Sequence, residues 1–253
     1  MATVGLSADA WLRRFHPKSA AGDVVVCFPH AGGSASYYFP FSAAMPPDVD
    51  MLTIQYPGRQ ERRAEPPVES VPELADQIAE LLAGWADSRL TFFGHSMGAT
   101  VAFEVARRLE AGGIAVHGLF ASGRRAPSTH RVEGLHLGSD AALIAELRDL
   151  SGMPVELLAD PEVVQLILPV LRNDLRIAET YRYEPDGSEL RCPIVALVGD
   201  QDPKVEVAEA AAWQRHTTGT FELRTFSGGH FFLVEHKAAV VEAVTKHAVA
   251  RNF

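Results

Sequence analysis

The sequence predicts an α/β fold in which a mostly parallel, doubly wound sheet carries an inserted helical segment. Short apolar runs of strand length alternate with stretches of helical periodicity, which is the pattern of strand–helix–strand units. Several runs are apolar at consecutive positions, as expected for strands buried on both faces of a parallel sheet. Of the 253 residues, 47% are hydrophobic, which is enough for the core of one such domain.

The expected elements follow in chain order. The predicted strands cover Val24–Phe28, Met51–Tyr56, Leu90–Gly94, Gly118–Ser122, Ile194–Gly199 and Phe221–Phe226. The clearest helix covers Val71–Trp85, where apolar residues recur at three- and four-residue spacing. Ser70 and Glu73 have the spacing of a capping box at its start. Right-handed crossovers should connect the strands.

One interval is too long for an ordinary crossover. About seventy residues separate the strand ending near Ser122 from the strand beginning near Ile194. The segments SDAALIAELRDLSG and DPEVVQLILPVLRNDLRIAETYRY within it have helical spacing, and Pro169 is expected to kink or divide the second. We therefore expect a single domain over residues 1–253 with a helical lid inserted at about residues 125–190. Extra structural packing is the alternative role for this insertion.

Composition narrows the class of protein. The formal net charge of −9 argues against general nucleic-acid binding. Cys27 and Cys192 lie in or beside apolar runs, which favours buried, reduced thiols and a reducing cytoplasm. The opening residues MATVGLSADAWLRRF lack the pattern of a signal peptide, and no apolar run approaches the ~20 residues of a membrane span. A soluble, cytoplasmic protein is expected.

The pentapeptide Gly94-His95-Ser96-Met97-Gly98 marks a candidate nucleophile. It matches G-x-S-x-G and stands between a predicted strand and a helical pattern over Ala99–Leu109, the setting of a nucleophile elbow. Glycines on both sides permit a strained turn and close approach of strand and helix. The alternative is that Ser96 only caps the helix.

A serine hydroxyl needs a base to become nucleophilic, and His230 is the candidate. It follows two glycines directly after a predicted strand, so it should lie at the same carboxyl edge of the sheet as Ser96. His95 lies inside the turn and is expected to pack rather than react. His236 lies at the start of the next helix and is the weaker candidate.

The base needs an orienting carboxylate, for which the segment PIVALVGDQDPKV offers Asp200 and Asp202. Both follow a buried strand directly. Asp202 is favoured because Pro203 restricts its backbone, while Asp200 stays open as the alternative. The order nucleophile, acid, base is the one associated with α/β-hydrolases.

Acyl transfer also requires donors for the developing oxyanion. The backbone N–H of Met97, directly after the nucleophile, should supply one. The turn Pro29–Gly33, after the first predicted strand, should supply the other from Ala31, because Gly32 and Gly33 permit close backbone approach. No Walker, G-x-G-x-x-G, H-E-x-x-H or paired C-x-x-C motif occurs, so no nucleotide or metal site is predicted.

Five ordered blocks resemble the type II thioesterases that accompany polyketide and nonribosomal-peptide assembly lines. The blocks are FPHAGGSASYY, YPGRQERRAEPP, FFGHSMGATVAFEVARRL, VGDQDP and SGGHFFL, and the resemblance extends over essentially the whole chain. It implies an α/β-hydrolase core with a mobile helical lid. In the family pattern Ser96 matches the nucleophile, His230 the base and Asp202 the orienting acid, with Ala31 and Met97 as the oxyanion amides.

The resemblance also implies a reaction: hydrolysis of aberrant or stalled acyl groups from the phosphopantetheine arm of acyl or peptidyl carrier proteins. No cofactor of the enzyme's own is expected, and a monomer is expected. Basic residues could form a rim that meets an acidic carrier protein; the candidates are Arg59, Arg62, Arg63, Arg124 and Arg125. The alternatives are a small-molecule carboxylesterase or lipase with the same triad and a non-catalytic interaction module on a hydrolase scaffold.

Overall fold

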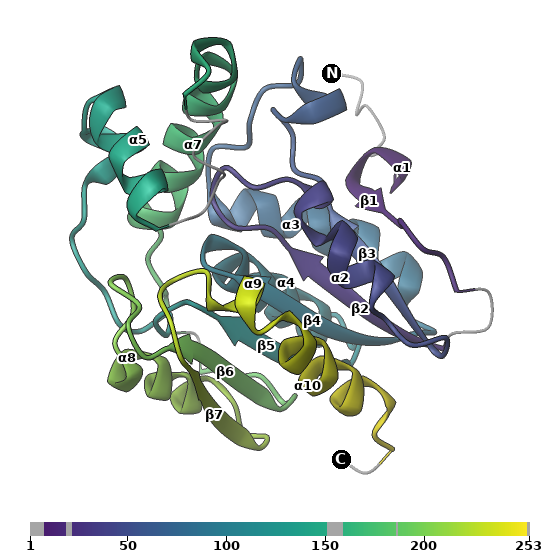
Figure 1. Cartoon of the computed structure of the whole chain (residues 1–253). Coiled ribbons are helices and arrows are strands. Elements are labelled where there is room, and N and C mark those ends of the chain that lie inside the picture. The colour runs from purple at the N-terminus through teal and green to yellow at the C-terminus, as the bar shows by residue number, and fades with distance from the viewer. Residues whose placement is uncertain (1–7, 19–21, 151–158, 186, 252–253) are drawn as a thin grey trace.

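A seven-stranded sheet organises the chain in the computed structural model, which describes residues 8–18, 22–150, 159–185 and 187–251 (Figure 1). The strands lie in the order β1-β3-β2-β4-β5-β6-β7, and all adjacent pairs are parallel except β1 with β3. Their bounds are Leu12–Arg13 (β1), Asp23–Phe28 (β2), Val49–Ile54 (β3), Arg89–His95 (β4), Val116–Ser122 (β5), Ile194–Gly199 (β6) and Phe221–Phe226 (β7).

The six predicted strands are confirmed, with small shifts at some ends, and one strand was missed. β1 has only two residues and neither is buried, so no hydrophobic pattern marks it. It is held in register against β3 with Leu12 opposite Ile54. The adjacent Trp11 side chain is buried, and its carbonyl accepts from the Gln55 backbone N–H at 2.7 Å. Tertiary packing, not local propensity, forms this strand.

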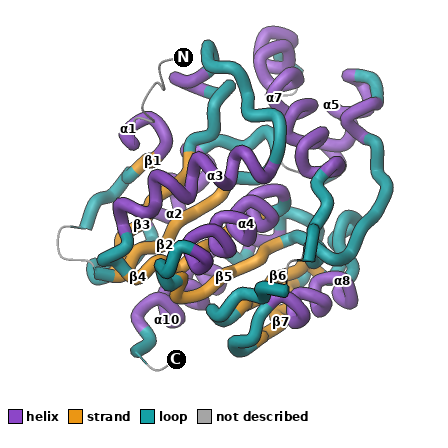
Figure 2. Tube along the Cα trace, turned by 180° about the vertical axis from the view of Figure 1, so that it is seen from behind, coloured by secondary structure: helices purple, strands orange, loops and turns teal. Residues whose placement is uncertain are grey.

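Helices cover both faces of the sheet. On one face lie α3 (Val71–Leu82), α4 (Met97–Ala111) and α8 (Val207–Ala211), and on the other lie α2 (Phe39–Ala43), α9 (Phe232–Glu235) and α10 (Lys237–Val249). Figure 1 shows α10 in front of the strands, and Figure 2, from behind, shows α3 and α4 in front of them. In β2, Val24 and Val26 face one core cluster while Val25 faces the other. Burial on both faces explains the continuous apolar runs.

Apart from the two helices of the insertion, which are described below, the other helical elements of the described residues are short. They are α1 (Ala8–Trp11) and five 3₁₀ turns: Ala35–Tyr38, Gln60–Arg62, Ala83–Trp85, Leu135–Leu137 and Ala212–His216. The predicted helix from Val71 to Trp85 is α3 followed directly by one of these turns. At its start the Ser70 hydroxyl accepts from the Glu73 backbone N–H at 3.2 Å, which is one half of the capping box.

The described part of the long insertion combines helices with loop segments. It contains α5 (Asp140–Asp149) and α7 (Pro161–Thr180), and residues 151–158 and 186 lie outside the described residues. Helix α7 runs through Pro169 as one element, so the predicted division does not occur. Proline removes one backbone hydrogen bond, and the buried turns that follow, which include Leu171 and Ile177, hold the helix in place.

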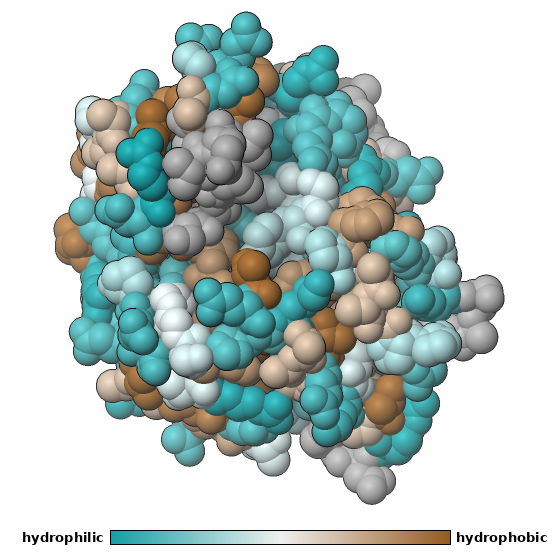
Figure 3. Space-filling model, viewed as in Figure 1, coloured by the Kyte–Doolittle hydropathy of each residue, from teal (hydrophilic) through white to brown (hydrophobic). Residues whose placement is uncertain are grey.

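The predicted state of the two cysteines is confirmed, because Cys27 and Cys192 are both buried free thiols. Burial raises the pKa of each thiol well above its usual value. In the part of the chain that the structure describes, no helix combines the length and apolar character of a membrane span. On the face shown in Figure 3, polar residues surround smaller apolar patches.

Candidate active site

Ser96 occupies a strained turn between β4 and α4. Its φ of 54° and ψ of −122° lie where non-glycine residues are rarely found. The positions on either side of the turn must be glycine because a side chain there would clash with the backbone. A Cβ on Gly94 would lie 2.3 Å from the Gly98 carbonyl oxygen, and a Cβ on Gly98 would lie 2.0 Å from the Phe28 carbonyl oxygen. The turn therefore has the tight strand–turn–helix geometry that the sequence motif predicted.

The turn presents the Ser96 side chain to a cavity. Ser96 is half-buried between the fully buried His95 and Met97, and it lines the cavity beside His230. Ser96 stands at the N-cap position of α4, but its side chain makes no capping hydrogen bond. The hydroxyl is thus not used to cap the helix. The first amides of α4 lie next to it, where a helix N-terminus favours negative charge.

His230 is paired with Asp202. The Nδ1 of His230 lies 2.9 Å from Oδ2 and 3.0 Å from Oδ1 of Asp202. The His230 side chain is 4% exposed and that of Asp202 is fully buried. The Asp202 carboxylate also accepts from the Lys204 backbone N–H at 2.8 Å, which fixes its orientation. The two residues come from the loops that follow the neighbouring strands β6 and β7.

The other candidates have different partners. Asp200 accepts from the Gly228 backbone N–H at 2.9 Å and so shapes the glycine turn before His230. The Nε2 of His236 lies 3.0 Å from the Ser227 hydroxyl. The buried His95 ring hydrogen-bonds the Ser122 hydroxyl through Nδ1 at 3.0 Å, and burial, with His230 and His30 nearby, lowers its pKa well below the usual value. The structure therefore brings Asp202, and not Asp200, to His230.

The predicted oxyanion donors lie beside Ser96. Ala31 and Met97 both line the cavity that contains Ser96. Met97 begins α4, so its N–H has no partner within the helix. Among the described residues, no hydrogen bond is recorded for the Ala31 N–H, whereas Gly32 and Gly33 donate to Asp174 Oδ2 and the His30 carbonyl. The geometry leaves Ala31 and Met97 as available backbone donors.

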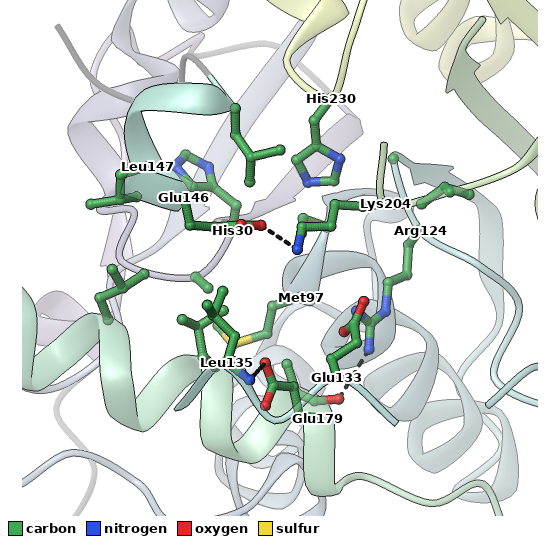
Figure 4. Close-up of a pocket in the computed structure, with 18 of the residues that line it drawn as sticks. His30, Met97, Arg124, Glu133, Leu135, Glu146, Leu147, Glu179, Lys204 and His230 are labelled. Atoms are coloured by element: carbon green, nitrogen blue, oxygen red, sulfur yellow. Dashed lines mark hydrogen bonds and ion pairs between the residues drawn. The ribbon is translucent and has the colours of Figure 1, made fainter. Parts of the chain in front are cut away.

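The cavity lies between the insertion and the carboxyl edge of the sheet, with His30, Met97 and His230 around it (Figure 4). Its apolar wall comes mainly from the insertion. The leucines that line it are Leu135, Leu143, Leu147, Leu150, Leu171 and Leu175. Burial and the charges of His230 and Arg59 lower the pKa of His30 to about 3, so this ring is neutral near pH 7.

Charged side chains at the cavity are mostly paired. Lys204 forms an ion pair with Glu146 of α5, which is drawn as a dashed line between these two residues in Figure 4. The Arg125 guanidinium lies 2.8 Å from the Glu133 carboxylate. Arg124 donates to the Ala178 carbonyl at 3.1 Å, and burial together with the charge of Arg125 lowers its pKa to about 10. Because most charged side chains at its edge form ion pairs, the cavity is apolar inside and has little unpaired charge at its edge.

The predicted basic rim is mostly wrong. Arg59, Arg62 and Arg125 are buried, with exposed fractions of 5–7%. Each is engaged within the protein: Arg59 with Asp174, Arg62 with Glu65 and Arg125 with Glu133. Arg124 is also occupied by neighbouring acceptors. Of the five candidates, Arg63 alone is exposed. The sequence alone does not show which of these arginines form ion pairs with carboxylates of the same chain.

Two features of the site were missed at the sequence level. Asp174 of α7 reaches the Gly32 N–H, and Lys204 links α5 to the Asp202 loop. A signal for Asp174 was present: with Leu171 and Ala178 it lies on the apolar face of α7, where an acid requires a partner. Among the residues that the structure describes, no group of three or more metal-ligating side chains could hold an ion.

Comparisons with known proteins agree with this geometry. A family model described as Thioesterase domain matches residues 24–248. Thioesterase PikA5 of Streptomyces venezuelae is 48% identical over 246 residues, covering 96% of this chain and 87% of that protein. A probable cadicidin biosynthesis thioesterase of Streptomyces griseus is 49% identical over 234 residues, covering 92% of this chain and 64% of that protein.

A solved structure supports the same assignment. The type II thioesterase BorB from the borrelidin biosynthetic cluster superposes with a TM-score of 0.90 at 48% identity. The match covers 96% of this chain and all of that one. Together with the parallel sheet and the strand–turn–helix at Ser96, these matches lead to one conclusion: the chain is an enzyme of the thioesterase family, with the α/β-hydrolase fold of type II thioesterases.

Proposed function

We propose that this thioesterase hydrolyses acyl groups from the phosphopantetheine arm of acyl or peptidyl carrier proteins through an acyl-Ser96 intermediate. The observation that carries the proposal is that His230, paired with Asp202, lines the same cavity as Ser96. The names of similar proteins, which refer to cadicidin biosynthesis and to the borrelidin biosynthetic cluster, support an assembly line as the source of substrate. Aberrant or stalled acyl units are the expected targets.

In the first half-reaction His230 acts as the base. Its Nδ1–H donates to Asp202, which leaves Nε2 with a lone pair toward the cavity. Nε2 takes the proton of the Ser96 hydroxyl as Ser96 Oγ attacks the thioester carbonyl carbon. The oxyanion is held by the N–H groups of Ala31 and Met97. The carbon–sulfur bond then breaks, and the proton on His230 passes to the pantetheine thiolate.

The second half-reaction repeats this sequence with water. His230 removes a proton from a water molecule that attacks the acyl-serine carbonyl, and the same N–H groups hold the oxyanion. Collapse expels Ser96, which regains its proton from His230, and the free acid leaves. Only protein groups and water take part, so no cofactor is needed beyond the arm that carries the substrate.

The acyl chain is proposed to lie against the leucines of the insertion. Leu143, Leu147 and Leu175 line the cavity from α5 and α7, and an aliphatic chain would gain by burial there. We propose that residues 125–190 form a lid within a single domain spanning residues 1–253. The enzyme is proposed to act as a cytoplasmic monomer that meets carrier domains transiently.

Two alternatives were open at the sequence level. A non-catalytic module does not fit membership of an enzyme family. An oxygen-ester carboxylesterase would use the same triad, so the substrate must be tested directly.

The test compares wild type with Ser96→Ala on a propionyl-loaded carrier protein and on an oxygen ester with the same acyl chain. Ser96→Ala should lose at least ~1,000-fold in kcat, and wild type should prefer the carrier thioester in kcat/KM. Retention of most activity by Ser96→Ala would overturn the mechanism. Preference for the oxygen ester would overturn the substrate class.

A further inference from the structure

We propose that Asp174, on the insertion helix α7, is a positioning residue for the oxyanion hole. It acts by holding the Ala31–Gly32 peptide so that the Ala31 N–H is left facing the cavity. The inference rests on the proposed function, because it assigns Ala31 the oxyanion role. It adds that a carboxylate distant in sequence, from the insertion rather than from the sheet, sets the geometry of that donor.

One carboxylate oxygen of Asp174 accepts hydrogen bonds from two donors. The Gly32 N–H donates to Asp174 Oδ2 at 2.8 Å, and the Arg59 guanidinium donates to the same oxygen. Arg59 is itself fixed by a 2.9 Å hydrogen bond to the Pro57 carbonyl. The side chains of Asp174 and Arg59 are 3% and 7% exposed. A carboxylate this buried is tolerable only when it is paired and hydrogen-bonded, so its direction is strongly determined.

The amides of the loop show what this contact does. After His30, the Gly33 N–H turns back to the His30 carbonyl at 2.9 Å, and the Gly32 N–H is taken by Asp174. Of these three consecutive amides, the Ala31 N–H is the one that donates to no acceptor among the described residues. Ala31 lines the cavity with Ser96 and Met97. Asp174 thus holds the Ala31–Gly32 peptide, which directly follows the Ala31 N–H.

The same turn of α7 also covers the loop. Gly32 has a φ of +73°, and a Cβ added to it would lie 3.1 Å from Cδ1 of Leu171. Leu171 and Leu175 flank Asp174 in sequence and both line the apolar cavity. One helical segment therefore contacts the proposed acyl chain through its leucines and the oxyanion loop through its carboxylate.

If the Asp174–Arg59 ion pair had only a structural role, its loss would have different kinetic effects. Losing it would lower stability and impair substrate binding and turnover without a particular pattern. Loss of oxyanion positioning should lower kcat while KM changes little, because the donor interacts most strongly with the developing charge. Affinity for a transition-state mimic should fall in parallel with kcat.

The experiment measures kcat and KM of the full-length enzyme on the propionyl thioester of N-acetylcysteamine. It also measures inhibition by an alkyl trifluoromethyl ketone, which adds to a reactive serine and places an oxyanion in the hole. In Asp174→Ala, which leaves the Gly32 N–H without its acceptor, we expect kcat to fall about 10- to 100-fold with KM within about threefold, and inhibitor affinity to fall by a similar factor. The matched control is Asp140→Ala, which removes the exposed ion pair between α5 and Arg172 of α7. It should leave all three quantities within about twofold.

Because a lone buried arginine could unfold the protein, a second variant replaces both partners. Arg59→Met/Asp174→Leu keeps the volume apolar and should fold, since such exchanges of a buried pair are often neutral in stability. It still lacks the acceptor for the Gly32 N–H and should show the same loss in kcat. A folded double variant with unchanged kcat and inhibitor affinity would overturn the inference.

Ser96→Ala, assayed alongside, separates the two proposals. If Ser96→Ala is inactive and the Asp174 variants match wild type, only the positioning role fails. If Ser96→Ala stays active, the proposed mechanism fails first.

Discussion

The two oxygens of Asp202 lie 2.9 and 3.0 Å from the same ring nitrogen, Nδ1 of His230. A carboxylate can only accept from that position, so Nδ1 carries the hydrogen and Nε2 is left as the acceptor. This is the tautomer that a base for Ser96 requires. Asp202 and His230 lie on the loops that follow the neighbouring strands β6 and β7, so the order of strands in the sheet brings the two residues together.

Removing the charge of Asp202 should therefore disable the base. In Asp202→Asn the amide could donate to Nδ1 and stabilise the wrong tautomer, so kcat should fall by about 10⁴ with the fold intact. Steady-state kinetics on a propionyl thioester and circular dichroism check both parts.

The matched control is Asp200→Asn, two residues away on the same loop. Its carboxylate accepts from the Gly228 backbone N–H, a bond that an asparagine oxygen can keep. We expect kcat within about threefold of wild type. Equal losses in the two variants would contradict the assignment of Asp202.

Gly98 should not tolerate a side chain. An added Cβ would lie 2.0 Å from the Phe28 carbonyl oxygen, so backbone must move in β2 or α4. Gly98→Ala should lower the free energy of unfolding by at least ~3 kcal/mol, measured by urea denaturation. Gly84→Ala is the control, because nothing lies within 4 Å of its added Cβ. A folded Gly98→Ala of wild-type stability would contradict the close approach at the turn.

The leucine wall should set the length of the acyl chain. Leu175 of α7 lines the cavity, so Leu175→Phe should fill space and lower kcat/KM for octanoyl thioesters about tenfold more than for propionyl thioesters. Leu166→Phe, on the same helix, is the control because Leu166 is 69% exposed. A panel of N-acetylcysteamine thioesters provides the measurement. Equal changes across all chain lengths would place the acyl group elsewhere.

Acid should destabilise the fold through His216. This ring is 2% exposed and its Nε2 accepts from the Ser128 backbone N–H, and burial, followed by the charges of Arg107 and Arg215, lowers its pKa to about 4. The unfolded chain, with a pKa near 6.5, binds this proton first as pH falls. The contribution of His216 to the free energy of unfolding is therefore fully present above about pH 6.5. It decreases below that pH, by about 2 kcal/mol at pH 5.

His216→Gln removes this titration. The variant should lose less stability than wild type between pH 7 and 5, while both should change in parallel between pH 7 and 8. Urea unfolding at the three pH values measures the difference. A wild type and a variant that decline equally toward pH 5 would show that His216 is protonated in the folded state.

Sequence reasoning succeeded where a local signal was tied to the sheet. Consecutive apolar residues located six strands, and glycine spacing located the turn at Ser96 because backbone approach there forbids a Cβ. The prediction of Asp202 rested on its neighbour Pro203, and the structure places its carboxylate on His230. Parallel strands bring their following loops to one edge, so residues far apart in sequence could be grouped in advance.

Sequence reasoning failed where a residue's partner lies in the insertion. Arg59 was predicted to lie on the surface because no residue of its own loop indicates a buried partner. That partner, Asp174, is 115 positions away in the sequence. β1 has two residues and no buried side chain, so it carries no pattern. Of the two effects expected of Pro169, a kink or a division, the division does not occur, because packing of the following turns keeps α7 continuous. Each of these depends on tertiary contacts that a single sequence does not display.

The central claim is that the acyl group passes through Ser96. It is tested most directly by mixing the enzyme with a propionyl-loaded carrier protein, quenching in acid within one turnover, and mapping the modified peptide by mass spectrometry. The account predicts a propionyl mass on the peptide that contains Ser96, absent in Ser96→Ala. Two results would contradict the account. One is an acyl group on a residue other than Ser96 during turnover. The other is full activity of Ser96→Ala with no acyl-enzyme detected.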